Sequence, residues 1–215
     1  FATFFGVIFG MIAALNQNTF WDHFFVSTST LGISMPSFVS ALLISMTFGF
    51  YLSEYTGLSM TGYLWERNNQ GELELALKNI ILPAFTLGIR PLAIITQLTR
   101  SSMLEVMSQD YIRTAKAKGL SKFTIIFKHA LKNAMNPVVT AVSGWLASLI
   151  AGAFFVEKIF AWRGLGMQTI DAVMYTLDLP IIMGAALVIG MGFIFVNILV
   201  DVLYAALDPR VKLNR

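Results

Sequence analysis

The sequence predicts an all-α membrane protein, a polytopic bundle of helices that crosses a bilayer several times. Of its 215 residues, 56% are hydrophobic and 13% carry a charge, against about 25% charged in an average soluble domain. The mean hydropathy is +0.70. The apolar residues lie in long uncharged runs separated by polar segments, which is the pattern of helices that span a membrane.

Five apolar segments predict five crossings within this chain. Residues 1–15 are too short to span a bilayer alone, so we expect them to be the end of a longer helix. After a polar connector at 16–23, the uncharged run of 22 residues at 31–52 predicts a complete transmembrane helix. The other predicted spans are 79–99, 133–156 and 179–200. With no internal repeat or long linker, residues 1–215 are expected to form one transmembrane domain.

The distribution of lysine and arginine predicts how this domain is oriented. If the spans are correct, ten basic residues lie on one side of the membrane: Arg100, Arg113, Lys116, Lys118, Lys122, Lys128, Lys132, Arg210, Lys212 and Arg215. The other side holds four: Arg67, Lys78, Lys158 and Arg163. Cytoplasmic loops carry the excess of positive charge, so the loop 100–132 and the C-terminus are predicted to be cytoplasmic. We also expect an N-terminal part to precede residue 1, giving six helices in the full chain.

The basic loop at 108–133 is predicted to fold as two short helices separated at Gly119. Ser108 is placed to cap the first helix, and Asp110 lies in its first turn, where the helix dipole favours a carboxylate. Ser121 is placed to cap the second. Two interpretations are open: a cationic amphipathic element that lies on the membrane surface, or a docking helix for a cytosolic partner.

Arg90 is the most informative isolated charge because it falls near the middle of a predicted span. An arginine facing lipid at that depth costs roughly 2.5–3.5 kcal/mol on insertion scales. We therefore expect Arg90 to face the bundle interior, a water-filled cavity or a partner subunit, beside a backbone that Pro91 loosens. It is either an anion-attracting group in a translocation path or a structural charge satisfied by neighbouring groups.

The motifs of common enzyme and metal sites are absent from the sequence. It contains no GxxxxGK[ST] phosphate loop and no cysteine, and its two histidines, His23 and His129, form no metal-binding motif. No catalytic activity and no bound cofactor are expected of this chain.

Residues 110–140, DYIRTAKAKGLSKFTIIFKHALKNAMNPVVT, resemble the cytoplasmic loop of the inner-membrane permeases of ATP-binding-cassette importers, specifically the dipeptide/oligopeptide permease B branch. Ala115 and Gly119 match the second alanine and the glycine of that superfamily's EAA-x3-G pattern. The sequence departs from the general pattern at Arg113, Thr114 and Lys132, and these departures resemble the peptide branch. Further segments resemble the same branch in the same order: GISMPSF at 32–38, ILPAFTLG at 81–88, LTRSSMLEVMSQDYIRTAKAKG at 98–119, FFVEKIFAWRGLG at 154–166 and NILVDVLYAALDPRVKL at 197–213.

The resemblance implies a type I importer permease that forms half of a translocation pore in a bacterial or archaeal inner membrane. It implies pairing with a second, similar permease, with cytosolic ATPases that hydrolyse ATP and with an extracytoplasmic solute-binding protein; lipid is the other partner, and no nucleic acid is expected. The coupling helix would dock on an ATPase, with Ala115, Ala117 and Gly119 allowing close approach. The implied docking residues are Gln109, Asp110, Tyr111, Arg113, Thr114, Ala115, Lys116, Ala117, Lys118, Gly119 and Leu120. Arg90 and Asn197 are the candidates for the translocation path.

Two other functions remain open at this point. One is a secondary transporter or channel that uses Arg90 in a proline-broken helix and an ion gradient. The other is a structural or assembly subunit without a pore. Peptides are the expected substrates of an importer, and nickel complexes, glutathione and sugar-derived compounds are the alternatives.

Overall fold

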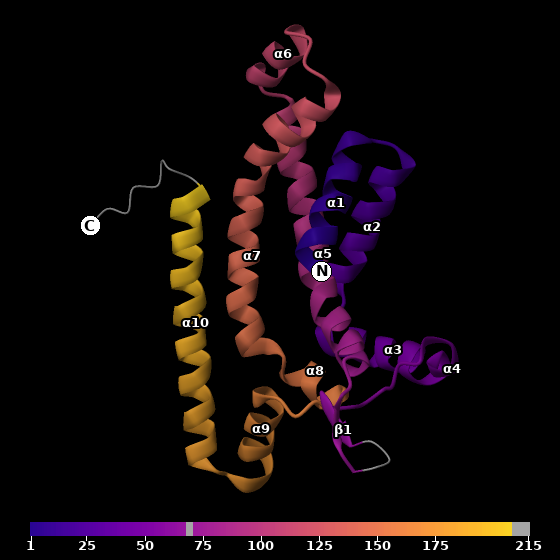
Figure 1. Ribbon diagram of the computed structural model, residues 1–215, viewed down its shortest axis with the longest axis vertical. Helices are drawn as coiled ribbons and strands as arrows, with labels where there is room; N and C mark the ends of the chain where they lie inside the picture. The colour runs from indigo at the N-terminus through magenta and orange to yellow at the C-terminus, as the bar shows by residue number, and fades with distance from the viewer. Residues whose placement is uncertain (68–70, 208–215) are drawn as a thin grey trace, which may run out of the picture. The chain divides into compact units, whose positions relative to one another are not determined.

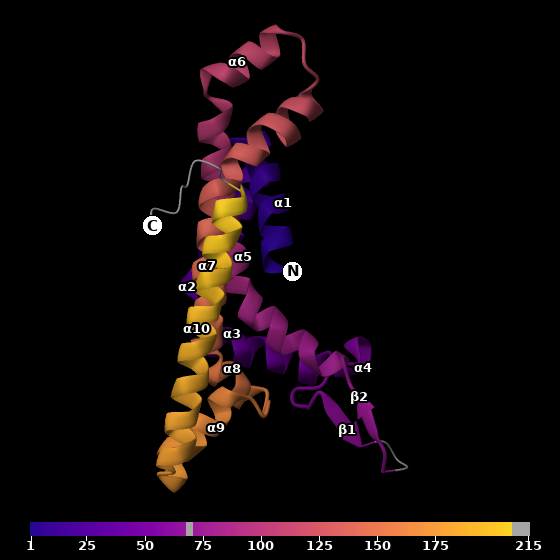
Figure 2. The same ribbon diagram turned by 60° about the vertical axis from the view of Figure 1, so that its left-hand side comes forward.

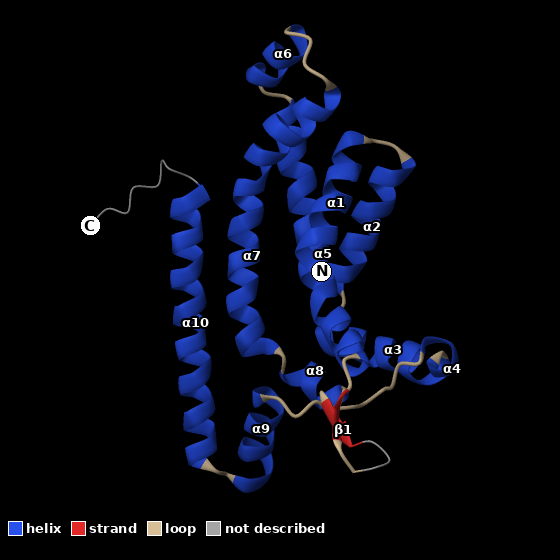
Figure 3. Cartoon of the chain, in the orientation of Figure 1, coloured by secondary structure: helices blue, strands red, loops and turns tan. Residues whose placement is uncertain are grey.

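The computed structural model describes residues 1–67 and 71–207, and helices dominate it (Figures 1 and 3). The chain divides into two compact units. The first unit contains Phe1–Pro36 and Gly88–Val142, and the second contains Ser37–Leu87 and the described residues from Ser143 onward. Two long helices, α5 (Lys78–Met107) and α7 (Lys132–Gly152), run from one unit into the other.

In the first unit the basic loop joins α5 to α7 at one end, and α1 and α2 complete the unit (Figure 1). Its elements are α1 (Ala2–Leu15), α2 (Phe20–Ser34), α5 (Lys78–Met107) from Gly88 onward, α6 (Asp110–Ala117), the π-helical segment η2 (Thr124–Leu131) and the start of α7 (Lys132–Gly152). Two glycines let α1 approach α5 closely. A Cβ atom on Gly10 would lie 2.5 Å from the backbone oxygen of Thr96, and one on Gly6 would lie 2.8 Å from Cγ2 of Ile95. This GxxxG spacing is a common solution for close packing of membrane helices.

The second unit holds short helices, a hairpin and one long helix (Figure 2). Its hairpin pairs β1 (Trp65–Arg67) with β2 (Leu73–Leu75) antiparallel, with Glu66 opposite Glu74. The helical elements are α3 (Ser37–Ile44), the π-helical η1 (Ser45–Tyr51), α4 (Ser53–Thr56), the start of α5, the end of α7, α8 (Phe154–Ile159), α9 (Leu165–Asp171), the π-helical η3 (Ala172–Thr176) and α10 (Leu179–Leu207).

The turn between α8 and α9 is held by a carboxylate of α8. Oε2 of Glu157 accepts a hydrogen bond of 2.9 Å from the backbone N–H of Met167 in the first turn of α9. A Cβ atom on Gly164, the residue before α9, would overlap that carboxylate, so a larger residue there would displace the side chain of Glu157. Nearby, the guanidinium of Arg163 lies over the ring of Tyr63, 5.0 Å from its centroid.

Two helices of the described part are long and apolar enough to cross a membrane: Lys78–Met107 and Leu179–Leu199. A third candidate consists of α2 together with Ser37–Tyr51, a pair that is bent by 107° at the break between its halves. The helix α1 is apolar but shorter. The described residues therefore contain two candidate spans, or three if the bent pair is one span.

The prediction of one helix at 31–52 is wrong, because that run contains a break. The helix α2 begins at Phe20, inside the predicted connector, and ends at Ser34. Met35 has an extended backbone, with φ −78° and ψ 127°. Pro36 explains this, since a proline disfavours the helical conformation of the residue before it. A new helix starts at Ser37.

The other predicted spans coincide with observed helices, with shifted ends. The span 79–99 lies within α5, which continues to Met107. The span 133–156 covers most of α7 and crosses the break before α8, and 179–200 lies within α10. The tail residues Arg210, Lys212 and Arg215, predicted to be cytoplasmic, lie outside the described residues.

Candidate functional site

The basic loop folds into two helical segments that separate at Gly119, as the sequence predicted. The first is α6, and the second begins after Ser121 and contains η2. Gly119 has φ +75°, in the left-handed region that favours glycine, and its N–H donates to the carbonyl of Lys116 at 3.0 Å. A Cβ atom there would meet nothing within 4 Å, so backbone conformation rather than space selects glycine.

One of the two predicted helix caps is present. The N–H of Thr124 donates to Oγ of Ser121 at 3.2 Å, which confirms the second cap. The prediction for Ser108 is wrong: Gln109 occupies the N-cap position of α6, and Oγ of Ser108 donates to the carbonyl of Glu105 at 2.7 Å. Ser108 lies one residue before the N-cap position of α6, because it still belongs to the turn that ends α5. Asp110 lies in the first turn of α6, as predicted.

The helix α6 has one buried face and one exposed face. Ile112 is fully buried and Ala115 is 7% exposed, within a cluster that includes Met103 of α5, Ile125 and Ala130 of η2 and Ala134 of α7. Ala115 therefore packs inside the chain, and its expected role in allowing close approach of a partner stays a prediction. The other predicted docking residues are exposed: Gln109, Asp110, Tyr111, Arg113, Thr114, Lys116, Ala117, Lys118, Gly119 and Leu120. Figures 1 and 2 show α6 at one end of α5 and α7.

A hydrogen bond between side chains closes this loop. Nδ2 of Asn133, in the first turn of α7, donates to the hydroxyl of Tyr111 at 2.9 Å and to the carbonyl of His129 at 2.9 Å. Tyr111 was predicted as a docking residue, and the structure also places it in this contact. Sequence reasoning missed Asn133, because two polar residues 22 positions apart carry no signal of contact.

Sequence reasoning also missed a buried ion pair next to the loop. Asp22 of α2 is 1% exposed, and its carboxylate accepts two hydrogen bonds from Arg100 of α5, at 2.5 and 2.7 Å. Oδ2 of Asp22 also accepts a hydrogen bond from the N–H of Asn18 at 2.9 Å. The sequence offered one signal of this pair: Asp22 is a single aspartate before one long apolar run, and Arg100 is a single arginine at the end of a second apolar run. This bidentate pair joins α2 to the part of α5 that leads to α6.

The two residues proposed for the translocation path belong to different units. Arg90 lies in the part of α5 that belongs to the first unit and is exposed there. Asn197 lies in α10 of the second unit and is half-buried.

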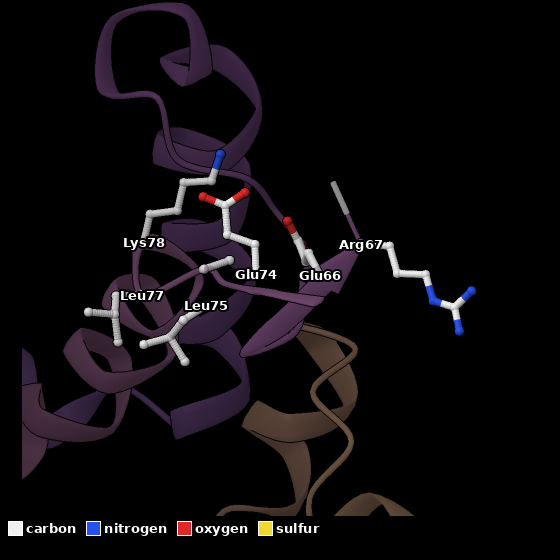
Figure 4. Close-up of a pocket in the computed structure, with 7 residues that line it drawn as sticks. Glu66, Arg67, Glu74, Leu75, Leu77 and Lys78 are labelled. Carbon is white, nitrogen blue, oxygen red and sulfur yellow. The ribbon is translucent and has the colours of Figure 1, made fainter. Parts of the chain in front are cut away.

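A hollow of about 400 Å³ lies beside the hairpin of the second unit. Figure 4 shows Glu74 and Lys78 extending toward the same region, while Arg67 points away. Nδ2 of Asn79 donates to Oε1 of Glu66 at 2.7 Å and to the carbonyl of Tyr63 at 2.9 Å. Within residues 1–67 and 71–207, no group of three or more His, Cys, Asp or Glu side chains is placed to hold a metal ion. The lining of the hollow combines the charged side chains Glu66, Arg67, Glu74 and Lys78 with the apolar Leu75, Ala76 and Leu77.

Comparison with known proteins identifies the family. Residues 6–213 match the family described as binding-protein-dependent transport system inner membrane component. The dipeptide transport system permease protein DppB of Bacillus subtilis strain 168 is 42% identical over 210 residues, which cover 98% of this chain and 63% of that protein. DppB of Haemophilus influenzae is 42% identical over 224 residues, covering 96% and 66%. DppB of Escherichia coli K12 is 39% identical over 231 residues, covering 99% and 67%.

These matches extend over nearly the whole chain, while the chain spans 63% of the length of the Bacillus relative. They bear out the resemblance that the basic loop and its neighbouring segments indicated. The family consists of multi-pass transport components of the inner membrane and not of enzymes. The chain belongs to the family of inner membrane components of binding-protein-dependent transport systems.

Proposed function

We propose that this chain is part of the permease subunit of an ATP-driven, binding-protein-dependent importer of short peptides. In this proposal α6 is the coupling helix that docks on a cytosolic ATPase. The observation that carries the proposal is the division of α6 into two faces. Ile112 and Ala115 fix the helix to the chain, while Arg113, Lys116 and Ala117 are exposed. The relatives named above are dipeptide transport permeases, which supports peptides as the substrates.

The packing of α6 suggests how motion would pass from the ATPase to the membrane helices. Its buried side chains contact residues of α5 and η2 in one cluster, and Tyr111 is bonded to the first turn of α7. A displacement of α6 therefore moves the ends of both long helices. Coupling requires that the ATP-bound and ATP-free partners hold α6 in different positions, because a ligand shifts an equilibrium only by its differential affinity for the two states.

The membrane arrangement in this proposal has five crossings in the present chain and six in the full permease, in the type I importer fold. The loop that contains α6 and the C-terminus face the cytoplasm, in agreement with the excess of lysine and arginine there. A second permease completes the pore, the ATPases hydrolyse ATP, and an extracytoplasmic binding protein delivers the peptide. The exposed residues from Gln109 to Leu120 form the docking surface, and Arg90 and Asn197 belong to the translocation path.

A charge reversal tests the docking surface directly. Lys116→Glu changes an exposed side chain of α6, so the chain should fold normally while a partner with acidic groups is repelled. The matched control is Arg67→Glu, the same reversal on the exposed hairpin of the second unit. The full-length complex is purified through the permease, and the ATPase that accompanies it is quantified. We expect a several-fold loss of ATPase for Lys116→Glu and none for Arg67→Glu; equal retention by both variants would contradict the proposal.

The same complex separates the proposal from a gradient-driven transporter. In proteoliposomes, peptide uptake should require ATP and the binding protein and should persist when ion gradients are collapsed. Uptake that follows an ion gradient without ATP would instead favour a secondary transporter that uses Arg90 in α5.

A further inference from the structure

Polar side chains follow one face of α5 through the candidate span. Arg90, Gln97 and Ser101 are separated by seven and four residues, and both spacings return to the same side of an α-helix. None of the three is buried within the first unit. An arginine facing lipid near the middle of a span is costly, roughly 2.5–3.5 kcal/mol, so this face is expected to meet protein or water instead.

The same face borders a groove between α2 and α5, inside the first unit. The groove has a volume of about 510 Å³, and its polar walls are Thr30 of α2 and Gln97, Arg100 and Ser101 of α5. Apolar side chains of the two helices, among them Val26 and Ile94, complete the lining. Sites for small ligands typically measure about 300–1,000 Å³ and combine apolar walls with a few placed polar groups. The groove agrees with that description in volume and lining, and it is an open groove rather than an enclosed cavity.

The hydrogen-bonding groups in the groove are only partly used by the chain itself. Nε2 of Gln97 donates to Oγ1 of Thr30 at 3.2 Å, which occupies one of the four hydrogen-bonding positions of that amide. Arg100 directs two of its five N–H donors to Asp22. The hydroxyls of Thr30 and Ser101 donate to the carbonyls of Val26 and Leu98. The groove therefore offers donors from Gln97 and Arg100, and acceptor oxygens from Gln97, Thr30 and Ser101.

The charge of the groove is balanced. Asp22 neutralises Arg100 through the bidentate pair, and the other polar walls, Thr30, Gln97 and Ser101, are uncharged. A free carboxylate or ammonium group would therefore find no net opposite charge among these residues. A neutral amide, in contrast, needs one donor and one acceptor, which the side chain of Gln97 supplies together.

We propose that this groove is a part of the translocation path that binds the main-chain amides of a passing peptide. This inference rests on the proposed function. Contact with neutral main-chain groups makes the passage independent of the charge of the peptide's side chains, while the apolar walls accept side chains of varied size. The residues in contact with the peptide are Gln97, Ser101 and Thr30, and Asp22 is a positioning residue that holds Arg100 at the edge.

Cysteine accessibility tests whether the groove contains water and peptide. Gln97→Cys and Thr30→Cys are introduced one at a time into a full-length permease that has no other cysteine, within the assembled transporter. A water-soluble thiol reagent should modify both positions, and dialanine with ATP and the binding protein should slow the modification several-fold. Arg67→Cys on the exposed hairpin is the control and should react at one rate with or without peptide. Failure of the groove positions to react, or reaction that peptide does not slow, would overturn the inference.

A second variant measures the hydrogen bond itself. Gln97→Leu keeps a similar volume and removes both amide functions, so the uptake of dialanine per ATP hydrolysed should fall roughly two- to tenfold, the size of one lost hydrogen bond. Dipeptides that carry an acidic or a basic side chain should lose the same factor. Thr28→Val, on α2 outside the groove lining, should keep normal uptake. Unchanged uptake for Gln97→Leu, or a loss that depends on peptide charge, would contradict main-chain recognition.

The two proposals fail in distinguishable ways. If the wild-type complex does not take up peptide with ATP, the proposed function itself is wrong. A different result would leave the proposed function intact. In that case the wild-type complex transports dialanine and the Gln97→Leu complex shows normal ATPase stimulation, but the groove cysteines stay unreactive. Only the assignment of the groove to the translocation path would then be wrong.

Discussion

Asn133 donates a hydrogen bond of 2.9 Å to the hydroxyl of Tyr111, and this bond connects the first turn of α7 to the first turn of α6. The basic loop between them is therefore closed at its two ends and is filled by the cluster around Ile112 and Ala115. The helix α6 is thus attached both to α7, through this bond, and to α5, through the cluster. In the proposed transporter these two attachments allow a displacement at α6 to reach the membrane.

Tyr111→Phe should separate coupling from folding. The substitution removes one hydrogen bond at a half-exposed site, so the free energy of unfolding should fall by about 0.5–1.5 kcal/mol at most. Peptide uptake per ATP hydrolysed should fall more clearly, because α6 is then less firmly tied to α7. Tyr55→Phe, at an 87% exposed tyrosine of the second unit, is the matched control. Identical uptake per ATP in both variants would show that the bond has no part in coupling.

Asp22→Asn should destabilise the first unit strongly. The variant removes the charge that balances Arg100, and breaking a buried pair by removing one partner typically costs about 3–5 kcal/mol. Because Arg100 is 25% exposed, we expect a loss near the lower end of that range, about 3 kcal/mol. Denaturant unfolding in detergent measures the loss. The double variant Asp22→Asn with Arg100→Gln should be more stable than Asp22→Asn alone. If the double variant instead loses as much free energy of unfolding as the two single variants together, the two residues are not directly paired.

Gly10→Ala should disturb the crossing of α1 and α5. Its Cβ atom would lie 2.5 Å from the backbone oxygen of Thr96, so one of the helices must shift, at an expected cost of about 1–3 kcal/mol. Gly144→Ala provides a control of the same chemistry, because a Cβ atom there meets nothing within 4 Å. A lowered melting temperature is expected for Gly10→Ala alone. If both variants have the melting temperature of the wild type, α1 and α5 do not approach each other closely at Gly10.

The ion pair of Lys158 with Asp171 should make the α8–α9 segment sensitive to alkaline pH. The ammonium of Lys158 donates to the carboxylate of Asp171 at 2.9 Å, and this bond raises the pKa of Lys158 above its usual value. A raised pKa in the folded state means that the stabilisation is present below the ordinary lysine pKa of about 10.4 and is lost as the pH rises through the folded value. Hydrogen exchange of α9 amides, compared between wild type and Lys158→Met, should differ at neutral pH and converge at alkaline pH. A difference that grows toward alkaline pH would contradict this assignment.

Much of the architecture could be predicted from the sequence, because long apolar runs and glycine at a helix end have direct physical causes. The break at Gly119, the cap by Ser121 and the membrane class followed from local chemistry. The break at Pro36 could also have been predicted, since the residue before a proline avoids the helical conformation. Hydropathy alone does not reveal this break, because the sequence is apolar on both sides of Met35.

The contacts that define the candidate site could not be predicted in the same way. Asp22 and Arg100 are 78 residues apart, and Tyr111 and Asn133 are 22 apart, so only the folded chain brings each pair together. The burial of Ala115 is likewise a tertiary property. Its position in the loop matched a family motif, but the packing of the cluster around Met103 decides which face of α6 is buried. Helical spacing does predict that Ile112 and Ala115 lie on the same face of α6, since they are three residues apart.

The most direct test of the account is a crosslink from the exposed face of α6. A single cysteine replaces Ala117 in the full-length permease, in native membranes, and a short thiol crosslinker is applied with and without ATP. Docking by α6 predicts an adduct with a cytosolic ATPase, and the yield of this adduct should change with nucleotide. The absence of an adduct from Ala117→Cys and from single cysteines at each exposed position between 113 and 120 would contradict docking by α6, and Arg90 would then be the next site to examine.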